Sequence, residues 1–441
     1  MAEPERTTIV RARVIHTPRD PFEGHELEAF DDGAVAFARG RILATGDFAH
    51  VRRNHAEAEI VDARDAVLLP GLVDLHVHFP QLPVLGAMGM HLLEWLKTRT
   101  LPQEARLADT AVARETARTF VRALAANGTT TALVFGAHFA EAQDALFAEA
   151  ERTGLRIASG LVVSDRELLP ELHTSPEAAH DASRALIERW HGRGRLRYAV
   201  TPRFSLSCTD AMLEVCGALM QTADGLLFTS HLNENIEEIA AVKERFPWST
   251  DYLHTYERFG LLGDASVLAH DVHPTDDELR RIGAARASVA HCPSSNAFLG
   301  SGIFPMRRHL ERRVRFALGS DVGAGTGLSL FKEGLTAYQV QMVRDNGQPL
   351  SPAHLLHLAT NAGAAALGLA DTVGDLTRGK SADYVLLRPP PGSTLATVLE
   401  HSPSAEATLG AIFTLAREDC VAEVRVAGDP VAANRAMFPN M

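Results

Sequence analysis

Two histidines, His76 and His78, stand two residues apart in the segment LLPGLVDLHVHFPQ, residues 68–81. The apolar run passes through a Pro-Gly pair into residues 72–79, whose composition is typical of a β-strand. In a strand, residues i and i+2 point to the same face, so both imidazoles can be directed at one point beyond the strand's carboxyl end. Two neutral imidazoles on one rigid strand could supply half of a zinc site.

Three further apolar segments end in residues that could complete such a site. His231 ends LLFTSH, His270 ends SVLAH and Asp321 ends VRFALGSD, and Glu234 follows His231 by three residues. Taken singly, each has a structural explanation: a core histidine for His270, a turn residue for Asp321 and a carboxylate at a helix N-terminus for Glu234. Taken together, they favour a metal site over chance.

The metal ligands that these segments suggest are His76, His78, His231 and Asp321, with water completing the coordination. Three nitrogens and one oxygen suit Zn²⁺, with Fe²⁺ as an alternative. A bound metal would lower the pKa of water towards about 7 and so provide hydroxide at neutral pH. His270 and Asp321 could orient or deprotonate that water, and Glu234 could carry its proton to a substrate and to a leaving group.

Between residues 70 and 374, short apolar runs alternate with helical stretches such as 104–127 and 236–246. Eight runs recur, namely LVDLHVH, TTTALVF, RIASGLV, RYAVTPR, LLFTSH, SVLAH, ASVAH and VRFALGSD. Strand–helix alternation favours parallel strands, and eight of them predict an α/β fold with a (β/α)₈ barrel of the TIM type. Because barrel active sites lie at the carboxyl ends of the strands, the candidate residues should converge there.

The two ends of the chain have a different pattern, in which β-branched residues alternate with polar ones between turn residues. Short strands are expected in residues 7–17, 33–46, 58–70, 381–389, 410–418 and 420–431. We therefore expect a small β-sandwich domain formed by residues 1–69 together with 375–441. The catalytic barrel would occupy residues 70–374.

Composition limits the classes of partner and the compartment. The chain has 441 residues, 46% of them hydrophobic, and a formal net charge of −12, which argues against a nucleic-acid partner. Its four cysteines form no CxxC pair, which predicts reduced thiols. The first residues lack the apolar core of a signal peptide, and no run approaches about eighteen uncharged apolar residues. We therefore expect a cytoplasmic protein with no membrane partner.

The segments PGLVDLHVH, SHLNEN, SVLAH and LGSD together resemble the amidohydrolase superfamily, along nearly the whole chain. Two-metal members of that superfamily often carry a carboxylated lysine on the fourth barrel strand. Here that strand reads RYAVTPRF, and no strand end carries any of the four lysines, Lys97, Lys243, Lys332 and Lys380. The resemblance therefore implies the single-metal branch, which consists mostly of deaminases, with one Zn²⁺ per chain.

Four further segments resemble the guanine deaminases of that superfamily: FPQ after HVH, LLEWLKTRTLPQEARLAD, PRFSLSC and HCPSSNAFLGSGIFP. The resemblance implies that Gln81, Arg203 and Phe204 hold a purine, with His231 and His270 also facing it. This fits a planar, polar base, because Gln can donate and accept, Arg donates and Phe can stack.

The implied reaction is the hydrolytic deamination of guanine to xanthine and ammonia. Activated water would attack C2, and Glu234 would protonate a ring nitrogen before ammonia leaves. Residues 91–108 would form a lid or rim, and members of the family are commonly homodimers. Two alternatives stay open: an enzyme acting on another purine such as 8-oxoguanine, a pterin or a triazine, and a metal-free scaffold protein that keeps the barrel for assembly.

Overall fold

All eight apolar runs that the sequence predicts as barrel strands are strands in the structure, a computed structural model that describes residues 7–431. They are, in chain order, β5 (Leu72–His78), β6 (Thr129–Phe135), β7 (Arg156–Gly160), β9 (Arg197–Pro202), β10 (Leu227–Leu232), β11 (Ser266–His270), β12 (Ser288–His291) and β13 (Arg315–Leu318). Neighbouring strands pair in parallel from β5 to β13, and the short β8 (Val162–Val163) also pairs in parallel with β9. Helices and side chains cover both faces of such a sheet, which explains the almost continuous apolar runs.

The barrel closes between β5 and the segment that follows β13. The backbone N–H of Asp321 donates to the carbonyl of His76 (2.8 Å), and the N–H of His78 donates to a carbonyl of the same segment (2.9 Å). One pleat earlier, the buried Asp74 carboxylate accepts from the backbone N–H (3.0 Å) and the hydroxyl (2.5 Å) of Ser320. Hydrogen bonds at this seam therefore fix Asp321 beside the two histidines of β5.

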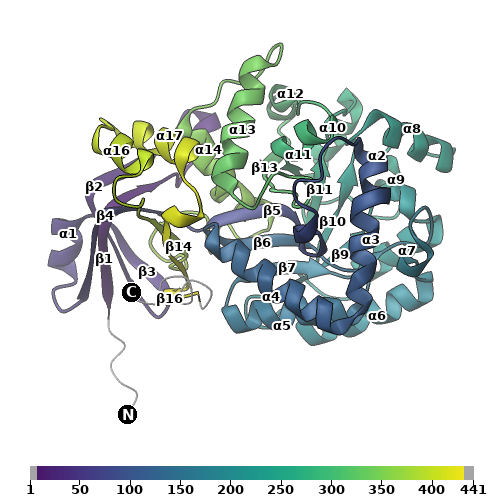
Figure 1. Cartoon of the computed structure of the whole chain (residues 1–441), viewed down its shortest axis with the longest axis horizontal. Coiled ribbons are helices and arrows are strands. Elements are labelled where there is room, and N and C mark those ends of the chain that lie inside the picture. Colours follow the sequence, from purple (N-terminus) through teal and green to yellow (C-terminus); the bar gives the residue numbers. More distant parts are fainter. Residues whose placement is uncertain (1–6, 432–441) are drawn as a thin grey trace.

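Helices lie outside the barrel strands (Figure 1). Among them, in chain order, are α4 (Thr110–Ala126), α5 (Ala140–Thr153), α6 (Pro176–Trp190), α7 (Asp210–Leu219), α8 (Ile236–Arg245), α10 (Asp276–Ala285), α11 (Pro293–Phe298), α12 (Met306–Glu311), α13 (Leu330–Val343) and α15 (Asn361–Ala366). Capping boxes fix where two of them begin: Asn235 with Glu238 starts α8, and Thr275 with Glu278 starts α10. The α8 box begins directly after Glu234 and so holds the chain on which this candidate residue stands.

Seven strands from both chain ends form a separate sheet, in the order β16-β15-β14-β4-β1-β2-β3. Their bounds are β1 (Thr8–His16), β2 (Glu28–Ala38), β3 (Arg41–Asp47), β4 (Glu59–Pro70), β14 (Tyr384–Leu387), β15 (Val421–Val426) and β16 (Asp429–Pro430). The expected β-sandwich takes the form of one hydrogen-bonded path of strands with register shifts in β1, β2 and β4. The antiparallel pairing of β4 with β14 confirms that both chain ends share a sheet.

The limits expected for the two domains, at 69/70 and at 374/375, stay predictions. Residues 1–6 and 432–441 of the expected β domain lie outside the described residues. Beside the sheet, Figure 1 shows the C-terminal helices α14 (Pro352–Ala359) and α17 (Ala405–Leu415) next to α13, with α16 (Thr394–Glu400) beside α17.

The strand expected in residues 410–418 is wrong, because these residues belong largely to the helix α17. Leu409, Ile412 and Phe413 are buried at helical spacing, and Ser404 caps the helix by accepting a hydrogen bond from the N–H of Ala407. A short apolar run fits a strand or a buried helix equally well by pattern. The cap and the packing of α17 against α13 and α14 decide for the helix.

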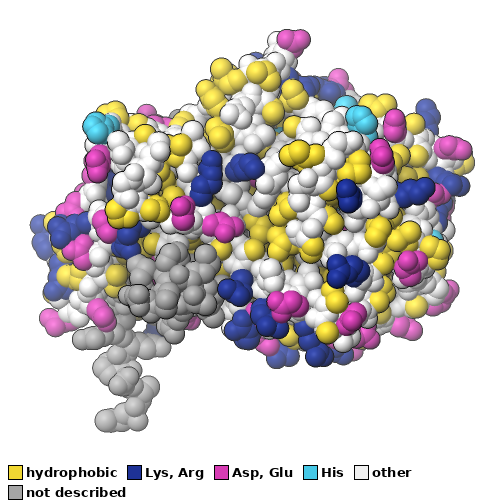
Figure 2. Space-filling model, in the orientation of Figure 1, with side chains coloured by type: hydrophobic (Ala, Val, Ile, Leu, Met, Phe, Trp, Pro, Cys, Tyr) yellow, Lys and Arg dark blue, Asp and Glu magenta, His cyan; other side chains and the backbone are white. Residues whose placement is uncertain are grey.

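The surface mixes charges of both signs. On the face in Figure 2, basic and acidic side chains are interspersed among polar and hydrophobic ones. Within residues 7–431, no helix combines the length and the apolar character that crossing a membrane requires.

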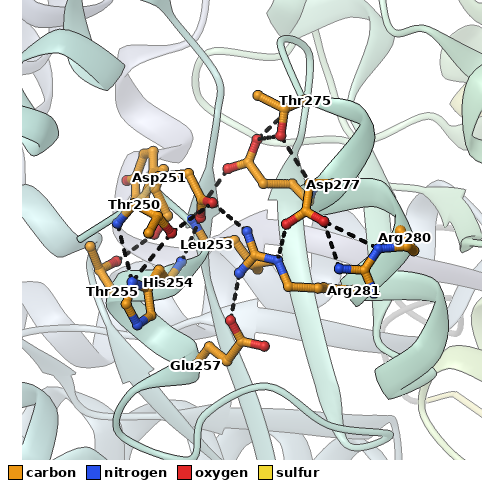
Figure 3. Close-up of polar contacts among 12 residues, drawn as sticks. Thr250, Asp251, Leu253, His254, Thr255, Glu257, Thr275, Asp277, Arg280 and Arg281 are labelled. Atoms are coloured by element: carbon orange, nitrogen blue, oxygen red, sulfur yellow. Dashed lines mark hydrogen bonds and ion pairs between the residues drawn. The ribbon is translucent and has the colours of Figure 1, made fainter.

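A polar network centred on Arg281 joins α10 to the segment around the short helix α9 (His254–Glu257), as Figure 3 shows. The guanidinium contacts three carboxylates: Asp251, Glu257 (2.5 Å) and Asp277 (2.9 Å). The Arg281 side chain is only 14% exposed, so its charge is partly removed from water. Since one cation contacts three carboxylates, we expect this network to stabilise the packing of α10 against the segment around α9.

Arg281→Ala should therefore lower the free energy of unfolding by about 2 kcal/mol, because the partly buried Asp251 and Glu257 lose the cation that they share with the exposed Asp277. The measurement is the midpoint of urea denaturation. Arg280→Ala is the matched control: Arg280 pairs with Asp277 in solvent, both side chains being about 60% exposed, and such pairs contribute less than about 1 kcal/mol. Equal midpoints for the two variants would contradict the expectation.

Candidate active site

Three histidines from two strands turn their Nε2 atoms towards one another at the carboxyl end of the barrel. The Nε2 atoms of His76 and His78 are 3.1 Å apart, and those of His78 and His231 are 3.4 Å apart. His76 and His78 come from alternate positions of β5, as the sequence predicts, and His231 comes from β10. These three side chains form one of the groups that could hold a metal ion.

Asp321 completes this cluster from the loop that closes the barrel. Its Oδ1 atom lies 3.3 Å from Nε2 of His76 and 3.2 Å from Nε2 of His78. Gly319 allows the approach, because a Cβ there would lie 2.9 Å from the Cβ of His76. Burial alone would raise the pKa of Asp321, but its contacts with the two histidines hold that pKa well below its usual value, so it stays an anion.

The donor set fits a metal ion. Four ligands about 2.0–2.2 Å from a tetrahedral zinc lie about 3.3 Å from one another, which matches the separations in this cluster. Ligating imidazoles must be neutral, and burial lowers the pKa of His78 to about 4 and that of His231 well below its usual value. The Nδ1–H of His231 donates to the carbonyl of Arg203 (2.6 Å), which leaves the lone pair on Nε2.

Glu234 and His270 lie beside the cluster. An oxygen of Glu234 is 3.5 Å from Nε2 of His270, and the hydroxyl of Ser301 donates to its other oxygen (3.2 Å). The Nδ1 atom of His270 is 2.9 Å from the side-chain oxygen of Asn296, and its Nε2 is 3.8 Å from Asp321. Burial, together with the negative charge of Asp321, raises the pKa of Glu234 to about 8. A carboxyl group with this pKa can hold and release a proton near neutral pH.

A pocket of about 400 Å³, including space open to solvent, lies over the cluster. All three residues predicted to hold a substrate, Gln81, Arg203 and Phe204, line it together with His78, His231, Glu234, His270 and Asp321. Gln81 and Arg203 are almost fully buried, and the Phe204 ring lies edge-on to His231, with ring centres 6.4 Å apart. The pocket therefore combines an aromatic wall with two groups able to donate hydrogen bonds.

The rim predicted at residues 91–108 also contributes to the pocket. It comprises α2 (Leu92–Trp95), one turn of π-helix (Leu96–Thr100) and α3 (Leu101–Ala105), and its residues Leu92, Trp95 and Leu96 line the pocket. No lysine is among the described residues that line it, which fits a site with one metal.

The family can now be stated, because the geometry is accompanied by a direct match. Residues 67–431 match the model of the amidohydrolase family. The chain belongs to the amidohydrolase family.

Comparison with individual members of the family shows which amidohydrolases the chain is similar to. The chain is 56% identical to a probable guanine deaminase of Deinococcus radiodurans, over 97% of this chain and 99% of that protein. Its fold is similar to that of E. coli guanine deaminase, with a TM-score of 0.91 and 33% identity over 97% of this chain and 99% of that one. It is also similar to a guanine deaminase from C. acetobutylicum that has guanine bound in its active site, with a TM-score of 0.89 and 26% identity over 97% and 100% of the two chains.

Sequence reasoning missed four polar residues that contact the side chains of this site and hold them in place. Glu104 contacts Gln81 and Arg203, and His138 contacts Glu104. Asn296 contacts His270, and Ser301 contacts Glu234. None of the four stands at a predicted strand end or in a metal-ligand spacing. A signal was available only for three of them, as members of quoted segments: Glu104 lies within LLEWLKTRTLPQEARLAD, and Asn296 and Ser301 lie within HCPSSNAFLGSGIFP.

Proposed function

We propose that this protein is a zinc-dependent guanine deaminase, which hydrolyses guanine to xanthine and ammonia. The observation that carries the proposal is that Gln81, Arg203 and Phe204 line the same pocket as His78, His231 and Asp321. His76 completes that cluster through its contacts with His78 and Asp321. The relatives named guanine deaminase, at 56% and 37% sequence identity, support the same substrate.

The pocket residues suit a purine base. Phe204 offers an apolar face against which a flat ring can pack, and Arg203 offers N–H groups to ring nitrogens or a carbonyl oxygen. Gln81 offers both a donor and an acceptor. Guanine carries a carbonyl, several ring nitrogens and an amino group on one plane, so such a set of partners can fix it in one orientation.

The reaction adds water at C2 and releases the 2-amino group as ammonia, so protons must move from water to a ring nitrogen and to the leaving amine. A bound Zn²⁺ would lower the pKa of water and so make a nucleophile available at neutral pH. His76, His78, His231 and Asp321 would hold that ion. Glu234, with its pKa raised to about 8, would carry the protons, and His270 with Asp321 would orient the water.

The test is to follow guanine consumption by purified protein through ultraviolet absorbance, with metal content determined on the same sample. We expect xanthine formation and about one zinc per chain. Removal of the metal by a chelator should abolish turnover, and added zinc should restore it.

Other results would point to the alternatives. Bound metal without turnover of guanine would direct the search to other purines, pterins and triazines. A protein that has no metal and no turnover, even after zinc is supplied, would favour the scaffold hypothesis. Turnover with bound iron would change only the identity of the metal in the proposal. The homodimer, the cytoplasmic location and the absence of a nucleic-acid partner stay predictions.

A further inference from the structure

A buried carboxylate, Glu104, lies behind the two polar residues proposed to hold the substrate. One of its oxygens accepts a hydrogen bond from the side-chain amide of Gln81 (2.8 Å). The other accepts from the guanidinium of Arg203 (2.6 Å) and lies 3.2 Å from Nε2 of His138. Glu104 comes from the rim helix α3, whereas Gln81 follows β5 and Arg203 follows β9. One carboxylate thus joins three parts of the barrel mouth.

The surroundings of Glu104 stabilise its ionised form. The side chains of Glu104, Arg203 and His138 are each no more than 3% exposed. Burial alone would raise the pKa of Glu104, but the charge of Arg203 and the contact with His138 hold it well below its usual range. Glu104 is therefore an anion that can only accept hydrogen bonds, and each of its oxygens faces a donor.

This arrangement fixes the orientation of the Gln81 amide. A carboxylate only accepts, so the NH₂ group of Gln81 must face Glu104, and the N–H of Gly323, which only donates, must face its oxygen (3.0 Å). One N–H and one lone pair of the amide then stay available. A rotation of the amide by half a turn would place NH₂ against an N–H and oxygen against a carboxylate, so only one orientation satisfies both neighbours.

Arg203 is held by two independent contacts. Its guanidinium donates to Glu104, while its backbone carbonyl accepts from the Nδ1–H of His231, a candidate metal ligand. Its remaining N–H groups are available to a ligand in the pocket. Glu104 also compensates a buried positive charge that would otherwise stand unpaired beside the candidate metal site.

We propose that Glu104 is a positioning residue, which holds Gln81 and Arg203 in the one orientation that binds the heterocycle. This rests on the proposed function of the pocket. Glu104 does not touch the substrate or the metal in this proposal. It acts by fixing which donors and which acceptor the two pocket residues present, and so it contributes to the recognition of guanine rather than to the chemical step.

Glu104→Gln is the decisive variant, because it keeps the size of the side chain and replaces one acceptor oxygen by NH₂. The new amide can accept from Gln81 or from Arg203, and its NH₂ group must then face the other donor. We expect KM for guanine to rise about 10- to 100-fold, with kcat within about threefold of the wild type. Metal content and thermal midpoint should stay close to those of the wild type.

Direct binding separates positioning from chemistry. Guanine affinity, followed by quenching of tryptophan fluorescence in a Glu234→Gln background, should fall by the same factor as KM rises. In a Gln81→Ala background, Glu104→Gln should raise KM by a smaller factor, because one of the groups that it positions is absent. Glu104→Asp, which keeps two acceptor oxygens on a shorter side chain, should give an intermediate KM.

Glu333→Gln is the matched control. Glu333 is a fully buried carboxyl group on α13 whose oxygens accept from the N–H (3.0 Å) and hydroxyl (2.7 Å) of Ser294, and it does not line the pocket. We expect its KM to stay within about twofold of the wild type.

The outcomes are distinct. Wild-type protein without guanine turnover overturns the proposed function itself. Wild-type turnover together with an unchanged KM and affinity in Glu104→Gln overturns the positioning role alone. A parallel loss of metal, thermal midpoint and kcat at constant KM would assign Glu104 a structural role and also overturn it. If Glu104→Gln does not fold, Glu104→Asp decides in the same way, and a KM within twofold of the wild type refutes the proposal.

Discussion

Glu234→Gln is expected to reduce turnover of guanine by about 1,000-fold or more while the protein keeps its metal. Glutamine has the size of glutamate but cannot accept a proton and pass it on, and general acid–base groups contribute about 10²- to 10⁴-fold to rates. Glu234 lies against His270 and Ser301 in the pocket, with its pKa raised to about 8. It is not part of the groups that could hold a metal ion, so zinc content should not change.

The measurement is kcat at saturating guanine, with zinc determined on the same preparation. Glu237→Gln is the control, because this neighbouring glutamate in the first turn of α8 is exposed and should tolerate the same change with less than about twofold loss. Near-normal turnover in Glu234→Gln would remove the residue from proton transfer. Loss of zinc in the same variant would instead show that it supports the metal.

The second large effect is expected for His78→Ala, which should lose metal and activity together. The substitution removes one of the three nitrogen ligands, so that only two imidazoles and one carboxylate remain. His78 is also the ligand that lies close to all three others. Nε2 of His78 lies 3.1 Å from that of His76, 3.4 Å from that of His231 and 3.2 Å from Asp321. We expect zinc affinity to fall by more than about 100-fold, since a protein ligand is lost outright.

Zinc per chain is measured after dialysis against a dilute zinc buffer, beside the activity of the same sample. Thermal unfolding gives a second reading, because a ligand that binds only the folded protein raises the midpoint with its concentration. Added zinc should raise the midpoint of the wild type and not that of His78→Ala. His401→Ala, at an exposed histidine after α16, should respond to zinc like the wild type. Full zinc occupancy in His78→Ala would exclude His78 as a ligand.

The sequence determined the barrel strands and the residues at their ends, because these signals are local. A parallel strand covered on both faces is a short apolar run, so each of the eight runs could be recognised without its neighbours. The spacing of His76 and His78 follows from the two-residue period of a strand. The carboxyl ends of barrel strands lie on one face, and from this alone His231, Glu234, His270 and Asp321 could be expected to meet.

Local pattern was insufficient where two structures share the same signal. The apolar run at 410–418 fits a strand as well as a buried helix, and α17 forms because Ser404 caps it and α13 and α14 pack against it. The closure of the barrel between β5 and the segment after β13 could not be predicted from the sequence either. Backbone hydrogen bonds from Asp321 and to Val322 close it, and backbone groups carry no residue-specific signal in a sequence.

Only the tertiary structure brought Glu104 to Gln81 and Arg203. The three residues come from the rim, from the end of β5 and from the end of β9, and no periodicity connects positions so far apart in the chain. The sequence named the side chains that could bind a metal and a base. Their orientation depends on contacts with residues of other elements, and these contacts exist only once the barrel has folded.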